Sequence, residues 1–322
     1  MNEQQDKIKL SVVVPVYNEE LTIDEMIARL SATCNAMGIA YELVFVNDGS
    51  ADASLAKLKE YAAINEHIHF ISFSRNFGHQ NAVMAGITYS RGETVVLIDG
   101  DLQDPPELIP QMYDKYLEGY KVVYAKRIQR KGETVFKKFT AKMFYKMLKK
   151  ITSFNIPVDT GDFRLISREV ADHLINMGEG SKFLRGQIAW LGFSQTGVEF
   201  ERQERKAGET KYTFKKMMRL ALDGITAFSN FPLQIATFLG FVFSLIAFLI
   251  ILYALFSKFV MNEVVTGWTS LMISSMFIGG IQLLCIGIIG EYISRISTDV
   301  KRRPPFIVEE TNCRKDSVTI KQ

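Results

Sequence analysis

The chain has 322 residues, enough for one sizeable domain and a further segment. Its 38 Lys and Arg and 35 Asp and Glu give a net charge of only +3, which excludes a globally basic protein. Three cysteines, Cys34, Cys285 and Cys313, follow no metal-binding or disulfide spacing, which argues against a disulfide framework and fits a reducing compartment. The polar N-terminus leads into a strand-like run and does not have the pattern of a signal peptide.

Five short runs rich in Val and Ile alternate with helical segments in the N-terminal part of the chain. Such alternation predicts an α/β fold, with a mostly parallel sheet that carries helices on both faces. The runs are apolar almost throughout, which is typical of strands buried on both sides. The predicted strands cover residues 10–16, 41–47, 67–73, 93–99 and 120–126.

Polar side chains follow three of these strands. Asn18 and Glu19 follow the first strand, Asp48 follows the second, and an acidic loop that begins at Asp99 follows the fourth. Ligands of such sheets bind beyond the carboxyl ends of the strands. We therefore expect a binding site at this edge of the sheet.

The acidic loop holds two carboxylates, Asp99 and Asp101, which are the oxygen ligands that a hard divalent cation prefers. Such a cation would bridge the phosphates of a nucleotide diphosphate and stabilise it as a leaving group. The same spacing also occurs in solvated turns, so its place after a buried strand carries the prediction. We expect a helix next, with Asp104 as N-cap, Pro105 at the first position and Glu107 at the third.

Residues 121–150 contain eleven Lys or Arg and one Glu. Within them, apolar residues at helical spacing predict a basic amphipathic helix at about 134–152, suited to an anionic membrane surface. The alternatives are an ordinary helix with a solvated charged face and a nucleic-acid contact; the membrane segments below favour lipid, and we expect no nucleic-acid partner. The apolar positions are Phe136, Phe139, Met143, Met147 and Ile151.

Two stretches without any charged residue, 224–257 and 264–290, each exceed the roughly 20 residues that a membrane-spanning helix needs. We predict a two-helix transmembrane hairpin, since buried helices of a soluble core are usually shorter and amphipathic. The expected parts are a catalytic domain at 1–212, an amphipathic juxtamembrane helix at 213–230, spans at 231–257 and 268–290, an external loop at 258–267 and a tail at 291–322.

Basic residues flank the outer ends of both spans, whereas the connecting loop holds one Lys and one Glu. By the positive-inside rule, the N-terminal domain and the tail are then cytoplasmic, which predicts a multi-pass protein of the cytoplasmic (inner) membrane. The flanking residues are Arg202, Arg205, Lys206, Lys211, Lys215, Lys216 and Arg219 before the first span, and Arg295, Lys301, Arg302 and Arg303 after the second.

Six motifs make the chain similar to family 2 glycosyltransferases and, within that family, to polyprenyl-phosphate glycosyltransferases related to dolichol-phosphate mannose synthase. The resemblance covers nearly the whole chain, including the two spans and the segment at 290–304. It implies a GT-A fold, a Mg²⁺ or Mn²⁺ ion and an inverting transfer, and family analogy also admits a homo-oligomer. The motifs are VVVPVYNEE (12–20), FVNDGS (45–50), SRNFGHQNAVMAG (74–86), DGDLQDPP (99–106), DTGDFRL (159–165) and RQERKAGETKY (202–212).

The resemblance also implies roles for single residues. Asp159 and Asp162 match the acidic positions near the reacting centre, and His79 lies near the donor pocket by analogy, although a structural histidine is an equal alternative. The implied ligands are Asp99, Asp101 and Gln103 for the metal and diphosphate; Pro15, Tyr17, Glu19 and Asp48 for the nucleotide; and Arg127, Arg130, Arg202, Arg205 and Lys211 for the acceptor phosphate and the diphosphate.

A phosphate acceptor is consistent with this set, because an anionic nucleophile needs a basic cradle and Arg binds phosphate through two hydrogen bonds. A phosphate monoester is mostly ionised at pH 7, since its second pKa is about 6, so a general base is less necessary than for a sugar hydroxyl. Asp159 is therefore interpreted as an orienting residue, with Asp162 as the competing candidate. A buried ion pair of either residue with Arg164 is the alternative.

Other functions explain less of the sequence. A processive polysaccharide synthase of the same superfamily would carry a Q-x-x-R-W motif, whereas this chain has Gln187-Ile188-Ala189-Trp190 and only two spans. A non-catalytic module that binds anionic lipid leaves the acidic loop and the six motifs unexplained. The expected donor is UDP-glucose, because the DTGDFRL motif resembles glucosyl-type members; GDP-mannose, a UDP-aminosugar and an aminopentose stay open.

Overall fold

The computed structural model describes residues 7–127, 160–179, 182–200, 231–260 and 267–313. It divides into two compact units, one made of 1–212 with 303–322 and the other of 213–302. The predicted basic helix at 134–152 and juxtamembrane helix at 213–230 lie outside the described residues. So do Asp159, Arg130, Arg202, Arg205 and Lys211.

The first unit is built on an eight-stranded sheet in the order β7-β5-β6-β4-β1-β2-β3-β8. β6 and β8 run against the other described strands, so the predicted mostly parallel sheet is confirmed as a mixed one. The strands are β1 (Leu10–Val16), β2 (Tyr41–Asn47), β3 (Ile68–Phe73), β4 (Thr94–Leu97), β5 (Val122–Arg127), β6 (Thr160–Ser167), β7 (Gln195–Phe200) and β8 (Val308–Thr311).

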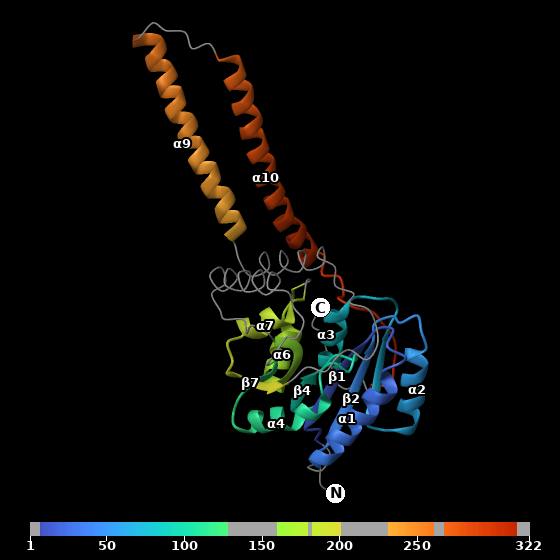
Figure 1. Cartoon of the computed structure of the whole chain (residues 1–322). Helices are drawn as coiled ribbons and strands as arrows, with labels where there is room; N and C mark the ends of the chain where they lie inside the picture. The colour runs from blue at the N-terminus through green and yellow to red at the C-terminus, as the bar shows by residue number, and fades with distance from the viewer. Residues whose placement is uncertain (1–6, 128–159, 180–181, 201–230, 261–266, 314–322) are drawn as a thin grey trace. The chain divides into compact units, whose positions relative to one another are not determined.

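Helices cover both faces of this sheet, as the alternating sequence predicts (Figure 1). Alternate residues of β1 point to opposite faces: Val12 and Val14 lie in the core beneath α1, α2 and α4, and Val13 lies in the core beneath α3, α6 and α7. The helices are α1 (Ile23–Met37), α2 (Ser54–Ile64), α3 (His79–Tyr89), α4 (Ile109–Leu117), α6 (Arg168–Asn176) and α7 (Leu184–Trp190).

The helix expected after the acidic loop begins later than its sequence predicts. A short 3₁₀ turn, Pro106–Leu108, precedes α4, and Pro105 is extended with φ −76° and ψ 121°. The helical region is disfavoured for a residue that precedes proline, and Pro105, which precedes Pro106, takes the extended conformation instead. Asp104 is therefore not the N-cap, and its side chain is buried instead.

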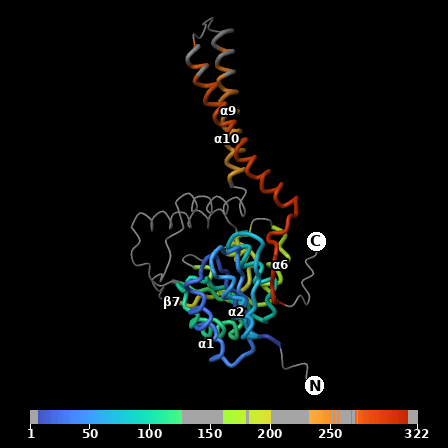
Figure 2. Tube along the Cα trace, turned by 90° about the vertical axis from the view of Figure 1, so that its right-hand side faces the viewer, coloured from blue at the N-terminus to red at the C-terminus, as the bar shows by residue number. Residues whose placement is uncertain are grey.

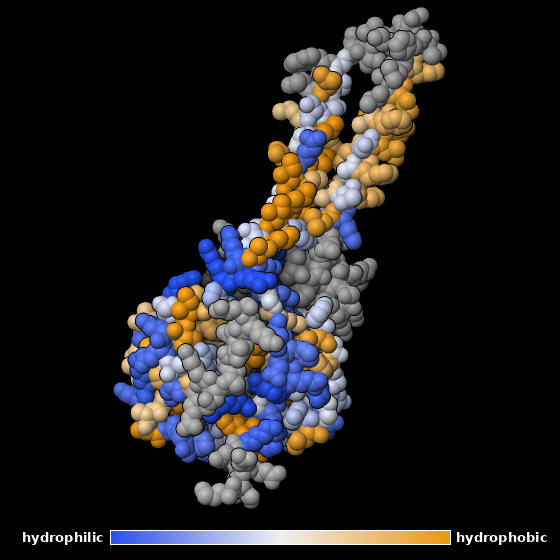
Figure 3. All heavy atoms as spheres, turned by 180° about the vertical axis from the view of Figure 1, so that it is seen from behind, coloured by the Kyte–Doolittle hydropathy of each residue, from blue (hydrophilic) through white to orange (hydrophobic). Residues whose placement is uncertain are grey.

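The second unit holds two long helices, α9 (Phe231–Val260) and α10 (Trp268–Val300), which run alongside each other in Figures 1 and 2. Both are long and apolar enough to cross a membrane, with candidate spans at Pro232–Ile250 and Ile273–Val300. Only 6% and 0% of these windows are buried, unlike the core helices of a soluble protein, and their visible faces are largely hydrophobic (Figure 3). The second helix continues ten residues beyond the predicted span end at 290.

After α10 the chain returns to the first unit. β8 pairs antiparallel with β3 at the edge of the sheet, and Phe306 stacks on Phe73 with ring centroids 5.2 Å apart. Asn312 fastens this strand, since its side chain accepts from the Phe70 N–H at 2.7 Å and donates to the Ile68 carbonyl at 3.2 Å. The predicted tail is therefore partly a strand of the eight-stranded sheet.

Candidate active site

The register between β4 and β6 brings two acidic residues together. Leu97 of β4 is paired with Arg164 of β6 in antiparallel fashion. Continuing this register two residues beyond the end of β4 sets Asp99 opposite Asp162. Directly opposed residues of an antiparallel pair have neighbouring side chains, so two motifs that are distant in the sequence meet at one edge of the sheet.

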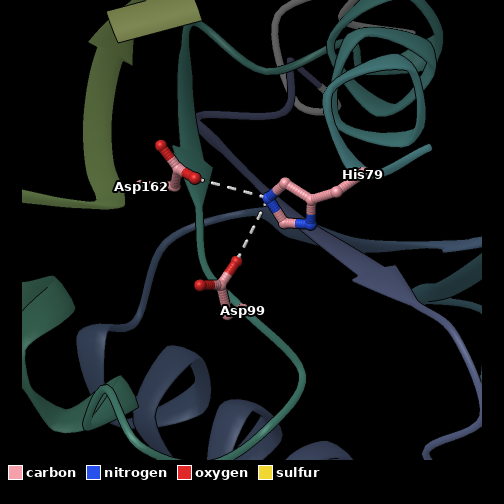
Figure 4. Close-up of side chains that lie close together, drawn as sticks. All are labelled: His79, Asp99 and Asp162. Atoms are coloured by element: carbon pink, nitrogen blue, oxygen red, sulfur yellow. Dashed lines mark ion pairs between the residues drawn. The ribbon is translucent and has the colours of Figure 1, made fainter. Parts of the chain in front are cut away.

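His79, the first residue of α3, completes this pair (Figure 4). Its Nε2 lies 3.5 Å from Oδ1 of Asp99 and 3.4 Å from Oδ2 of Asp162. Among the described residues, these three form the one cluster of His, Cys, Asp or Glu whose ligand atoms, all within 4.8 Å of one another, could hold a metal ion. We name it the acidic triad.

The pKa values of Asp99 and His79 depend on the other members of the acidic triad. Burial raises the pKa of Asp99 to about 6 against the lowering effect of His79, and the nearby carboxylates of Asp162, Asp104 and Asp101 raise it further. Burial opposes the charged form of His79, but the bond to Asp162 and the charge of Asp99 raise the pKa of His79 to about 9. The Nε2 of His79 therefore lies where both carboxylates would stabilise a positive charge, and a metal ion bound there would compete with a proton on this nitrogen.

The second carboxylate oxygen of Asp162, Oδ1, is bound by Arg185, a residue that lies in none of the six motifs. Nε of Arg185, on α7, donates to Oδ1 of Asp162 at 2.6 Å. Burial favours the neutral acid, but Arg185 and His79 hold the pKa of Asp162 well below its usual value. Arg164, the partner considered from the sequence, donates instead to the backbone carbonyls of Gly161 and Asp162. The expected alternative of an Asp162–Arg164 side-chain pair is therefore corrected to Asp162–Arg185.

The loop that precedes α3 is anchored on Asp48. The Asp48 carboxylate, 3% exposed, accepts the backbone N–H of Phe77 at 2.7 Å and that of Gly78 at 3.0 and 3.2 Å. Gly49 allows this approach, because a methyl group there would lie 2.6 Å from backbone atoms of Arg75 and Asn76. Asp48 thus fixes the loop that presents His79, and its predicted nucleotide contact stays a prediction.

The remaining residues predicted to bind the nucleotide lie at the end of β1 and in the loop after it, and β1 lies between β2 and β4. Pro15 is buried in the strand, whereas Tyr17, at 42% exposure, and Glu19 lie in the loop after it. The hydroxyl of Thr22 ties this loop to the acidic loop by donating to the Gly100 carbonyl at 3.0 Å. The three polar strand ends therefore meet at one edge, as the sequence predicts.

The other predicted metal ligands lie in the turn after Asp99. The backbone N–H of Gln103 donates to Oδ1 of Asp101 at 3.1 Å, and Leu102 between them has a positive φ of 58°. Asp101 is not part of the acidic triad. Arg127 ends β5 beside Phe200 of β7; a contact of its side chain with an acceptor stays a prediction.

Comparisons with known proteins agree with this architecture. Residues 11–175 match the family described as glycosyl transferase family 2. The chain is 50% identical over 304 residues to the glycosyltransferase YkcC of Bacillus subtilis, with 94% of each chain covered. It is 39% identical to the prophage bactoprenol glucosyl transferase homolog of Escherichia coli, covering 94% of this chain and 99% of the relative. A bactoprenol glucosyl transferase of Shigella flexneri derived from prophage SfII is also 39% identical, over 95% and 99%.

Proposed function

This chain belongs to glycosyltransferase family 2, and on that premise we propose that it transfers glucose from UDP-glucose to a polyprenyl phosphate at the cytoplasmic face of the membrane. The choice of sugar and acceptor is supported by the bactoprenol glucosyl transferases that resemble it over nearly their whole length. The single structural observation behind the proposal is the acidic triad, which lies at the carboxyl ends of the parallel strands in a chain that also has two long apolar helices.

The residues of the acidic triad fit a divalent cation. Two carboxylates and one imidazole are ligands that Mn²⁺ accepts, and Mg²⁺ would rely on the carboxylates. Bound there, the cation would stabilise the diphosphate that leaves the sugar. Asp101 and Gln103, which are joined by a hydrogen bond in the adjoining turn, would contact the same diphosphate. Tyr17, Glu19 and Asp48 would contact the nucleotide.

The proposed reaction is a single displacement that inverts the anomeric carbon. An oxygen of the lipid phosphate attacks C1 of glucose, the bond from C1 to the diphosphate oxygen breaks, and UDP leaves with the electron pair. Because the attacking phosphate is already an anion at neutral pH, Asp159 would orient the reactants, with Asp162 of the acidic triad as the competing candidate for this role. Arg127 and Arg130 would bind the acceptor phosphate, and Arg202, Arg205 and Lys211 would close over the diphosphate.

A lipid acceptor explains the second unit. The helices α9 and α10 would hold the enzyme at the bilayer, where a polyprenyl phosphate presents its head group. The basic segments 134–152 and 213–230 would rest on the anionic cytoplasmic surface. Family analogy admits a homo-oligomer; the proposed chemistry is assigned to a single chain.

The deciding experiment is a transfer assay with the full-length protein in detergent or nanodiscs. Radiolabelled UDP-glucose, UDP-N-acetylglucosamine and GDP-mannose are each supplied with undecaprenyl phosphate and Mg²⁺ or Mn²⁺. Formation of a lipid-soluble product from UDP-glucose, and from neither of the other two donors, supports the proposal. Transfer only from another donor would replace glucose by that sugar, and no transfer from any donor would contradict the proposal.

A further inference from the structure

The Asp162 carboxylate points toward His79 and Asp99, an orientation that some contact must stabilise. Its side chain is 18% exposed and stands opposite Asp99, a second carboxylate whose side chain is 31% exposed. Two carboxylates in such a place repel each other, so rotation of Asp162 away from the acidic triad would relieve the repulsion. His79 contacts Oδ2 but is shared with Asp99, and it sits 3.4 Å away.

Arg185 supplies the constraint from the opposite side. Its Nε lies 2.6 Å from Oδ1 of Asp162, the shorter of the two contacts to this carboxylate. A hydrogen bond between ionised groups is among the strongest that side chains form, and it is directional. With Oδ1 held by Arg185, Oδ2 remains on the side of His79 and Asp99.

The helix that carries Arg185 is itself fixed to the helix that carries His79. The side chain of Gln80 on α3 accepts the backbone N–H of Leu184 on α7 at 3.1 Å. Leu184 and Ile188 of α7 are buried in the hydrophobic core that also contains residues of α3. The consecutive pairs His79–Gln80 and Leu184–Arg185 therefore meet twice: once directly, and once through Asp162.

From this geometry we propose that Arg185 is a positioning residue, which holds the Asp162 carboxylate in the rotamer that completes the acidic triad. The inference rests on the proposed function, because it concerns the same active site. Arg185 would act through Asp162 and not by contact with the sugar or the metal. Mutation of a residue that hydrogen-bonds to a metal ligand typically lowers metal affinity or activity about 10- to 100-fold.

The test compares Arg185→Ala and Arg185→Lys in the full-length enzyme. Arg185→Ala should lower kcat about 10- to 100-fold with little change in the KM for the nucleotide-sugar, and should weaken Mn²⁺ binding measured by the free-ion electron paramagnetic resonance signal. Arg185→Lys keeps a cation on a flexible stem without the planar guanidinium, so it should recover part of the loss.

Arg168→Ala is the matched control. Arg168 is also a partly buried arginine, 28% exposed against 33% for Arg185, and it donates to the Gly92 carbonyl and the Ser90 hydroxyl, not to the acidic triad. A positioning role predicts that Arg168→Ala lowers the melting temperature without changing Mn²⁺ affinity. Equal losses of kcat in both alanine variants, in step with their melting temperatures, would reduce Arg185 to a structural residue.

Two further results would overturn the proposal. Wild-type kcat and Mn²⁺ affinity in Arg185→Ala would show that Asp162 needs no support. A raised KM for undecaprenyl phosphate at unchanged kcat would show that Arg185 binds the acceptor itself. A wild-type protein that binds Mn²⁺ but transfers none of the tested sugars would contradict the proposed function, while the Mn²⁺ affinities of the variants would still decide the role of Arg185.

Discussion

The carboxylate of Asp48 accepts the backbone N–H of Phe77 at 2.7 Å, and this contact joins the end of β2 to the loop that begins α3. The next residue, Gly78, donates to the same carboxylate, and His79 follows directly. Burial raises the pKa of Asp48, whereas these backbone donors lower it. The position of His79 in the acidic triad therefore depends on a side chain at the end of β2, three strands away from the β6 strand of Asp162 in the sheet order.

Asp48→Asn should weaken this anchor. The amide can accept through its oxygen, but its NH₂ group would face the N–H of Phe77 or Gly78, which leaves a donor unsatisfied at a cost of about 1–3 kcal/mol. We expect a lower melting temperature, a higher KM for the nucleotide-sugar and weaker Mn²⁺ binding. Asp24→Asn, which removes an exposed ion pair with Lys57, serves as the control and should change none of the three appreciably. Unchanged Mn²⁺ binding in Asp48→Asn would show that the loop holds His79 without Asp48.

Metal removal tests the acidic triad directly. EDTA should inactivate the enzyme, and Mg²⁺ or Mn²⁺ should restore it, because the diphosphate would otherwise leave without charge compensation. Asp99→Asn should abolish transfer under all metal concentrations, whereas His79→Ala should be partly rescued by excess Mn²⁺, since two carboxylates remain. Radiolabelled product formation measures each case, and full activity in EDTA is the result that would exclude a metal.

The sequence predicts the sheet well because its strands are continuous apolar runs, and β1 and β2 have the predicted bounds. It also selects Asp99 and Asp162, since both lie in recognisable motifs. It does not reveal that β6 is antiparallel to β4, which sets these two residues opposite each other. Arg185 is missed for the same reason: it lies in no motif, and only the docking of α7 on α3 brings it to Asp162.

The start of α4 shows the limit of local rules. Each residue of Asp104-Pro105-Pro106-Glu107 suits a helix start by itself, but the second proline restricts the first. The tail shows a limit of another kind. Nothing in residues 308–311 alone requires pairing with β3, because the partner strand lies more than two hundred residues earlier, as the 241-residue separation of the Thr311–Phe70 hydrogen bond shows.

Membrane topology can be checked with reporters that are active only outside the cytoplasm. A fusion at Asn262 should be active and a fusion after Gln322 should be silent, because basic residues flank the outer ends of the spans. Fusion at the C-terminus leaves β8 intact, and β8 belongs to the catalytic sheet, so the tail and the catalytic domain must lie on the same side. Activity after Gln322 together with silence at Asn262 would reverse the proposed orientation.

Substitution of Asp159, which immediately precedes β6 in the sequence, separates an orienting role from that of a general base. The acceptor phosphate is ionised at neutral pH, so the reaction does not require a proton acceptor. If Asp159 orients the reactants, Asp159→Asn keeps the size and part of the hydrogen bonding and should lose only part of the rate. An obligatory base predicts that the Asn and Ala variants are equally inactive, with a loss of about 10⁴-fold, the upper end for acid–base groups.

The pH profile gives the second measurement. With an orienting Asp159, the rate should fall below about pH 6 as the lipid phosphate dianion takes up one proton, because the resulting monoanion is the weaker nucleophile. The lipid phosphate is present in every variant, so this acidic limb should persist in Asp159→Asn. A limb that disappears in Asp159→Asn, while a measurable rate remains, would assign the proton to Asp159 and make it the general base.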